Sequence, residues 1–183
     1  MADLADDVIG RASAGDIAAF EEIYRYHAGM VYRVALRMMA RVEDAEEVTQ
    51  QVFISVHKHL KSFNGKSSLK TWLYRITVNC SLNTLKARKR HVEVAWVEGF
   101  DPEDTHDNVR ETLTRGEIHQ QITDLLEEIT PDQRACILFR TQEGLSYEEI
   151  ALTLGINVNT VRSRLKRARE ALLTARTRKG VAV

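Results

Sequence analysis

The stretch SYEEIALTLGINVNTVRSRLKRAR, residues 146–169, carries the most specific structural pattern in the chain. Counting from Tyr147, the fifth residue is the small Ala151, the ninth is Gly155 and the fifteenth is the β-branched Val161. A small side chain lets two helices cross closely, and glycine tolerates the backbone of the tight turn between them. The pattern therefore predicts a helix-turn-helix.

The predicted second helix of this motif has an apolar side and a basic side. Val161, Leu165 and Ala168 recur at helical spacing and form the apolar side. The residues that we assign to DNA contacts are Asn159, Thr160, Arg162, Ser163, Arg164, Lys166 and Arg167. Such a helix can enter the major groove, where arginine binds guanine or phosphate, and the sequence alone does not separate these two roles. The alternative is a solvated amphipathic helix.

Capping signals divide the second half of the chain into helices. Ser146 with Glu149 forms one capping box, and Thr130 with Gln133 forms another that is followed by proline at the first helical position. Asn159 or Thr160 is expected to cap the second helix of the motif. These signals predict helix starts at residues 131 and 147.

The first half of the chain is also helical in pattern. Asp16 is a plausible N-cap for a first helix, and Asp44 is expected to start a second. The apolar residues expected on the buried sides of the first three helices are Ile17, Phe20, Tyr24, Val31, Ala35, Met38, Val48, Val52, Val56, Leu60, Leu69, Trp72, Leu73, Ile76 and Cys80. Because no segment alternates with period two over a useful length, we expect an all-α fold with essentially no sheet.

Charge is unevenly distributed along the 183 residues, although the net charge is zero. Lys and Arg outnumber Asp and Glu by 8 to 0 in residues 61–91 and by 8 to 1 in residues 161–183. Acidic residues outnumber basic ones in the other two blocks, 1–60 and 92–160. Two basic blocks of this kind are typical of a protein that binds a polyanion such as nucleic acid.

The basic block at residues 61–91 contains a second candidate binding surface. Asn79, Asn83, Lys86 and Arg90 follow one another at helical spacing opposite the apolar side. Amide and ammonium groups can hydrogen-bond bases and phosphates, and the preceding loop carries an aromatic residue, Phe63. The alternative is an ordinary helix surface, with Trp72 in the core.

An acidic, turn-rich segment without a sustained apolar stripe separates the two halves. We therefore expect two small helical domains, at residues 1–91 and 114–176, joined by a flexible acidic linker at residues 92–113 and followed by a tail at residues 177–183. Another amphipathic helix is expected around Ile118, Ile122, Leu125, Leu126 and Ile129.

These blocks, in this order and separation, resemble a family over most of the chain. The matching segments are Gly15-Asp16 with Phe20–Tyr24, Asp44–Phe53, Leu69–Asn79, Leu145–Ala151 and Thr160–Arg169. The chain resembles an extracytoplasmic-function sigma factor of bacterial RNA polymerase, in the sigma-70 family. The resemblance implies two helical domains that direct core polymerase to promoters, with no enzyme activity, cofactor or metal.

The resemblance also implies roles for particular residues. By this resemblance, the residues that dock on the polymerase β′ clamp are Asp44, Glu47, Gln50, Gln51 and Phe53. The resemblance implies that the minus-10 element is recognised with one base flipped out of the duplex. The residues that it assigns to this recognition are Phe63, Asn64, Lys66, Ser67, Ser68, Trp72, Asn79, Asn83 and Lys86. The helix from Thr160 to Arg169 would read the minus-35 element, and the second domain would meet the β flap. Asn83 and Lys86 depart from the Asp and Arg that are frequent in the family. The resemblance further implies inhibition by an anti-sigma protein.

Two other classes of protein fit part of the sequence. A DNA-binding regulator with an N-terminal sensor domain would explain the helix-turn-helix, and it would bind duplex DNA without polymerase. An enzyme or metal sensor is disfavoured because the six histidines are scattered and neither cysteine has a partner at metal-ligand spacing. Both cysteines are expected to be buried thiols. With no apolar run long enough to cross a membrane, we expect a cytoplasmic protein without membrane insertion.

Overall fold

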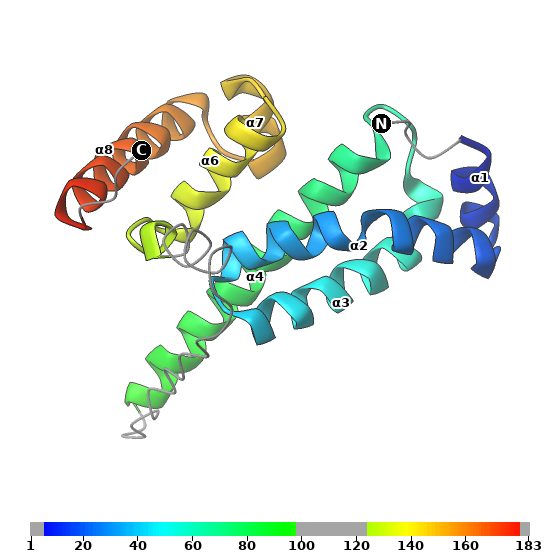
Figure 1. Cartoon of the computed structure of the whole chain (residues 1–183), viewed down its shortest axis with the longest axis horizontal. Coiled ribbons are helices and arrows are strands. Elements are labelled where there is room, and N and C mark those ends of the chain that lie inside the picture. The colour runs from blue at the N-terminus through cyan, green and yellow to red at the C-terminus, as the bar shows by residue number, and fades with distance from the viewer. Residues whose placement is uncertain (1–5, 98–123, 180–183) are drawn as a thin grey trace. The chain divides into compact units, whose positions relative to one another are not determined.

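The computed structural model describes residues 6–97 and 124–179, and all of its regular elements in those ranges are helices. They are α1 (Asp6–Ala14), α2 (Ile17–Met39), α3 (Val42–His59), the short 3₁₀ helix η1 (Leu60–Ser62), α4 (Leu69–Val97), α6 (Pro131–Gln142), α7 (Tyr147–Leu154) and α8 (Val158–Lys179) (Figure 1). The chain divides into two compact units, Met1–Ser81 and Leu82–Val183. The expected all-α fold is confirmed.

In the first unit, α2 packs along α3, and α1 packs on α2 and η1. Ile23, Val31 and Val48 are fully buried in this unit, and Leu73 and Val78 of α4 are also fully buried. Asp16 caps α2 as expected, because its Oδ1 accepts hydrogen bonds from the backbone N–H of Ala18 (2.9 Å) and Ala19 (3.2 Å).

The buried side of α2 agrees with the prediction at Val31, Ala35 and Met38 but differs from it nearer the start of the helix. Ile17 is 79% exposed and Tyr24 is 46% exposed, whereas Ile23 and His27 are buried. The buried residues Ala19, Ile23, His27 and Val31 repeat every four positions, and this row places Ile17 and Tyr24 at its edge. The prediction was wrong at these two positions because several apolar rows fit a helix of this length.

The start of α3 also differs from the prediction. The helix begins at Val42, with Arg41 as a cap residue that makes no side-chain cap hydrogen bond. Asp44 is therefore inside the first turn, where it is 7% exposed, and is not the N-cap. An acidic residue in this turn is still favoured, because the unpaired N–H groups of a helix start carry positive partial charge.

In the second unit, α6 and α7 both pack on α8. Phe139 of α6, Ile150 of α7 and Leu165 of α8 are almost completely buried. Residues 124–127 are helical, and Leu126 and Ile129 join Ala168 in an apolar cluster. The predicted helix around these residues is confirmed there, while its first two positions, Ile118 and Ile122, lie outside the described residues.

The two predicted capping boxes are present. The Thr130 N–H donates to Gln133 Oε1 (2.9 Å) and the Gln133 N–H donates to Thr130 Oγ1 (3.3 Å). Ser146 and Glu149 form the same pair, at 2.8 and 3.1 Å. The helix starts at residues 131 and 147 are thereby confirmed.

Gly155 ends α7 in the left-handed conformation, with φ 63° and ψ 38°. The start of α8 is two or three residues earlier than predicted. Asn157 Oδ1 accepts a hydrogen bond from the Asn159 N–H at 2.8 Å, so Asn157 caps α8 rather than Asn159 or Thr160. An asparagine that directly follows the turn reaches the unpaired N–H groups of the first helical turn before the later candidates can.

Helix boundaries also differ at the predicted linker and tail. Helix α4 continues to Val97, so residues 92–97 are helical rather than a flexible linker, and α8 continues to Lys179, into the predicted tail. The rest of the linker and residues 180–183 lie outside the described residues. A helix persists where its hydrogen-bond ladder continues, even without an apolar stripe, because propagation needs no new nucleus.

Three further findings concern membrane spans, metal sites and the two cysteines. No helix in the described part is long and apolar enough to cross a membrane. Within residues 6–97 and 124–179, no group of three or more His, Cys, Asp or Glu side chains is placed to hold a metal ion. Both cysteines are free thiols, Cys136 buried as expected and Cys80 half-buried.

Candidate nucleic-acid and polymerase interfaces

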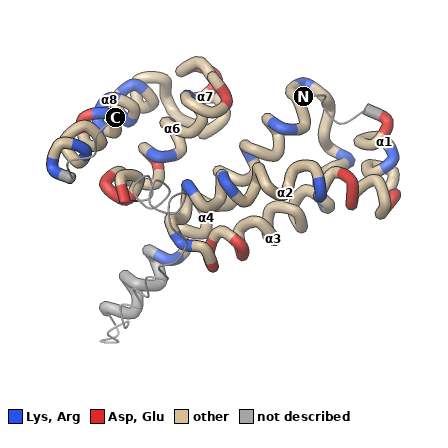
Figure 2. The backbone as a smooth tube through the Cα atoms, in the orientation of Figure 1, with Lys and Arg blue, Asp and Glu red and all other residues tan. Residues whose placement is uncertain are grey.

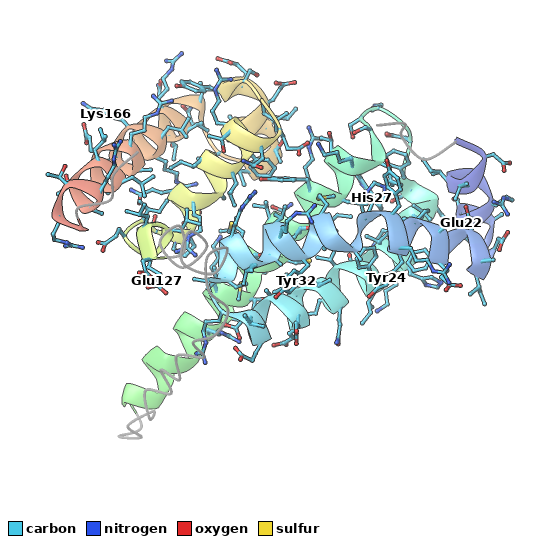
Figure 3. All side chains as sticks on the ribbon, in the orientation of Figure 1. Glu22, Tyr24, His27, Tyr32, Glu127 and Lys166 are labelled. Atoms are coloured by element: carbon cyan, nitrogen blue, oxygen red, sulfur yellow. The ribbon has the colours of Figure 1, made fainter. Side chains whose placement is uncertain are left out.

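The basic side of α8 is open to solvent over most of its length. Asn159, Arg162, Ser163 and Arg167 are exposed, and the Lys166 side chain is 78% exposed. Lysine and arginine recur along this helix (Figure 2), and Lys166 lies about midway along it (Figure 3). These predicted DNA-contacting residues lie on one helix that is held from behind by the buried Val161 and Leu165.

Two of these side chains are ordered by contacts within the first turns of α8. Arg162 Nη1 donates to Asn159 Oδ1 at 3.1 Å, and Ser163 Oγ donates to the Thr160 carbonyl at 3.0 Å. Such local hydrogen bonds hold the polar groups near the helix start, which is the part of a recognition helix that meets base edges.

Arg164 does not share this exposed surface. Its side chain is 25% exposed, and its Nη2 lies 3.3 Å from Asp132 Oδ1 of α6. Its positive charge also acts on the Cys136 thiol of α6, whose pKa it lowers against the larger effect of burial. Arg164 therefore lies at the edge of the basic side, because three residues from Val161 and four from Ala168 place it beside the buried seam.

The loop that precedes α4 contains an aromatic pair. The rings of Phe63 and Trp72 are 5.3 Å apart between centroids at an interplanar angle of 51°, and both side chains are half-buried. Trp72 therefore contributes to packing and is still partly accessible. Gly65 turns the loop at φ 68°.

Polar groups of the same loop take part in local hydrogen bonds. Asn64 Oδ1 accepts from the Lys66 N–H at 3.2 Å, and Ser68 Oγ accepts from the Thr71 N–H at 3.1 Å. Lys66 is exposed, whereas Ser67 is half-buried. The hydrogen bond from Thr71 gives Ser68 a structural role at the start of α4.

The predicted polar stripe of α4 is exposed at Asn79, Asn83 and Lys86. The opposite side of the helix is buried at Thr77 and Ser81. The structure thus places these three side chains on one accessible face, and the Arg90 side chain lies outside the described part.

The predicted polymerase-docking residues of α3 separate into two groups. Glu47, Gln50 and Gln51 are exposed, and Gln51 Nε2 donates to Glu47 Oε1 at 3.0 Å. Asp44 and Phe53 are 7% and 5% exposed. The direct contact predicted for the latter two is thus disfavoured by their burial.

Packing explains the position of Phe53 and reveals one residue that the sequence analysis missed. The Phe53 ring packs edge-on against Tyr24, with centroids 4.7 Å apart. Ile54, the next residue, is 56% exposed and follows Gln50 and Gln51 on the same side of α3. An isoleucine beside a row of exposed glutamines was a detectable signal, since its neighbours already marked the solvent side.

Burial changes the ionisation of groups in the second unit. The Arg134 guanidinium is buried and its Nη2 donates to the Leu126 carbonyl at 2.5 Å. Burial lowers the pKa of Arg134, and the negative charge of Glu127 (Figure 3) partly opposes this. Burial raises the pKa of the Cys136 thiol, against the charge and hydrogen bond of Arg164. The segment before α6 is thus tied to α6 by a buried charged group.

Comparison with known proteins identifies two regions of the chain. Residues 23–91 match the family model for sigma-70 region 2, and residues 119–172 match the model for sigma-70 region 4. The chain belongs to the sigma-70 family. It is a sigma factor of the extracytoplasmic-function group, a subunit that acts in transcription initiation.

Individual relatives agree with this assignment. The sigma factor is 34% identical over 178 residues to the extracytoplasmic-function sigma-E factor of Escherichia coli, covering 92% of this chain and 93% of the relative. It is 35% identical to SigE of Mycolicibacterium smegmatis over 87% of this chain, which spans 63% of that relative's length. A solved structure of the sigma factor RpoE in complex with the anti-sigma factor NepR, from Bartonella quintana, is 25% identical with a TM-score of 0.63, covering 85% of this chain and 95% of that chain.

The match to region 2 decides against a regulator with an N-terminal sensor domain, because it covers the part of the chain that the sensor would occupy. The resemblance inferred from the sequence is thereby confirmed.

Proposed function

We propose that this sigma factor binds core RNA polymerase and directs it to promoters that carry a minus-35 and a minus-10 element. The observation that carries the proposal is the pairing of region 2 and region 4 in one chain, each with an exposed polar surface on a packed helix. The proposal includes action in the cytoplasm, where polymerase and DNA are found, without enzyme activity, cofactor or metal of its own.

Docking on the polymerase β′ clamp is proposed for the exposed side of α3. Glu47, Gln50 and Gln51 supply hydrogen-bonding groups, and Ile54 supplies apolar surface beside them. Asp44 and Phe53 act indirectly in this proposal, by holding α3 in the core. A polar face with an apolar side chain is the composition expected of a reversible protein contact.

Recognition of the minus-10 element is proposed for the loop before α4 and the exposed face of α4. Asn79, Asn83 and Lys86 are exposed and would contact bases and phosphates, and the Phe63–Trp72 pair would offer ring surface at the loop. Extruding a base costs on the order of a few kcal/mol of stacking, so a loop that recognises the extruded base favours melting at the matching sequence.

Recognition of the minus-35 element is proposed for the exposed residues of α8, with the same unit meeting the β flap. Arg162, Lys166 and Arg167 supply the positive charge, and Ser163 supplies a neutral hydrogen-bonding group. Arginine binds guanine with two hydrogen bonds, and such a contact is worth about 1–3 kcal/mol of discrimination.

Control by an anti-sigma protein is the last part of the proposal. Its support is the similarity to a sigma factor that was solved in complex with an anti-sigma factor. Leu152 of α7 and Leu173 of α8 are 85% and 61% exposed, and burial of such apolar side chains contributes to binding of a protein partner.

The test is transcription in vitro with the purified chain and bacterial core polymerase on a promoter library. Initiation that depends on the chain and shares two upstream elements is the expected result. The double variant Gln50→Ala, Gln51→Ala should lower binding to core polymerase, and Arg25→Ala on the exposed side of α2 is the control. Unchanged polymerase binding by the double variant would remove the docking assignment.

A matched pair of arginines on α8 tests the DNA contacts. Arg167→Ala should reduce the preference for the selected upstream element by roughly 1–3 kcal/mol if it reads a base. Arg178→Ala removes the same charge near the end of the helix, where the side chain pairs with Glu128, and should leave the preference unchanged. Equal losses in both variants would point to general attraction of phosphates instead.

A further inference from the structure

The contact between Arg164 and α6 bears on how region 4 reads DNA. The Arg164 side chain is 25% exposed and its guanidinium lies 3.3 Å from the Asp132 carboxylate. A guanidinium that is held in an ion pair with Asp132 is directed toward α6, whereas a base-reading arginine must reach outward into the groove. The exposed Arg162 and Arg167 meet that second requirement.

The position of Asp132 is itself well determined. Asp132 lies in the first turn of α6, directly after Pro131 and between the two partners of the Thr130–Gln133 capping box. The reciprocal hydrogen bonds of that box and the fixed φ of Pro131 restrict the backbone at this point. The carboxylate is therefore presented from a rigid position.

Arg164 lies on α8 between two buried contacts. Val161 and Ala168, one turn to either side, are fully buried, and Ala168 packs with Leu126 and Ile129. Leu165, the residue after Arg164, is buried in the same seam. Apolar contacts of this kind are non-directional. A directional ion pair beside the seam can therefore define the rotation of α8 relative to α6.

We propose that Arg164 is a positioning residue, which orients the recognition helix α8 on α6 through Asp132 and does not itself read the minus-35 element. This inference rests on the proposed function, since it assumes that α8 reads DNA. It makes Asp132, which lies on a different helix, a determinant of promoter specificity.

The experiment is promoter selection by the holoenzyme, using the full chain with core polymerase and a library randomised at the upstream element. Asp132→Asn removes the ion pair without altering α8, and it should lower the ratio of transcription from selected to scrambled elements by about two- to fivefold, the effect of one ion pair between partly exposed side chains. Glu148→Gln is the control, because it removes the same charge from the exposed first turn of α7. The control should leave the ratio unchanged.

A double-mutant cycle with Arg164→Gln separates positioning from direct contact. If Arg164 acts through Asp132, the double variant should lose no more specificity than either single variant. Independent, additive losses, or a large loss for Arg164→Gln with none for Asp132→Asn, would mean that Arg164 contacts DNA and would overturn the proposal.

Stability is measured in the same variants, by hydrogen exchange in α6, α7 and α8 below their unfolding temperature. A role limited to folding would lower protection or melting temperature while leaving the promoter ratio intact, and this result also overturns the proposal. Failure of the proposed function has a different signature, since the unaltered chain would then give no promoter-specific initiation with cognate core polymerase.

Discussion

Gly155, between the two helices of the helix-turn-helix, allows a sharp test of the turn. Its φ of 63° and ψ of 38° lie close to the ideal left-handed conformation, and Gly155 and Ile156 both donate backbone hydrogen bonds to the Ala151 carbonyl. A Cβ atom at Gly155 would meet no atom within 4 Å, so substitution by alanine adds backbone strain without a clash.

The magnitude follows from two opposing effects. A residue with a Cβ pays about 1–2 kcal/mol in the left-handed conformation. Alanine also restricts the unfolded chain, which returns roughly 0.4–1 kcal/mol. Gly155→Ala should therefore destabilise the second unit by on the order of 1 kcal/mol, and Gly155→Asn by less, because asparagine tolerates this conformation.

The assay is hydrogen exchange in α7 and α8, together with thermal unfolding, in which about 1 kcal/mol shifts the midpoint by roughly 4–8 °C for a domain of this size class. Gly10→Ala is the matched control. Gly10 also has no atom within 4 Å of a built Cβ, but it lies inside α1 and lacks a positive φ, so alanine should stabilise it by about 0.5–1 kcal/mol. If Gly155→Ala protects α7 and α8 as well as glycine does, the strain argument is refuted.

Three other outcomes are expected. Ser146→Ala removes the hydrogen bond from the Glu149 N–H and should destabilise the second unit by about 1 kcal/mol, seen as faster exchange at the start of α7. Ile23→Ala leaves a cavity at a fully buried position and should cost about 2–5 kcal/mol in urea unfolding of the first unit, with unchanged exchange in α8. Burial raises the pKa of the Cys136 thiol, so its contribution to stability is complete below the ordinary thiol pKa and is lost as pH rises through the higher pKa of the folded protein. Cys136 should accordingly react slowly with iodoacetamide at mildly alkaline pH until denaturant is added, and equally fast alkylation of the native protein would contradict its burial.

Structural features that depend on interactions between residues close in the sequence were predictable from the sequence. Both capping boxes and the tight turn at Gly155 were predicted correctly, because each depends on residues only a few positions apart in the sequence. The order of the two regions was also predictable from the sequence, since their motifs are local and the acidic segment separates them. Even so, the cap of α8 was assigned to Asn159 or Thr160 rather than Asn157, which shows that helix ends are sensitive to the geometry of the preceding turn.

The burial of individual site residues was harder to predict from the sequence. Phe53 was assigned to polymerase docking, yet its ring packs against Tyr24 of α2, and the neighbouring Ile54 is exposed instead. Helical periodicity identifies which residues share a side of a helix. It does not show which of those residues a neighbouring helix covers. That boundary depends on how two helices cross.

The sequence by itself determined the all-α class, the helix-turn-helix and the family, because these follow from local spacing of small, apolar, capping and basic residues. The tertiary structure alone decided which basic residue of α8 pairs with α6. Arg164 and Arg167 are both basic residues on one helix and look equivalent in sequence, but only Arg164 comes within reach of Asp132. The reason is physical: Asp132 lies on another helix, and an ion pair between helices exists only after packing brings the two charges together.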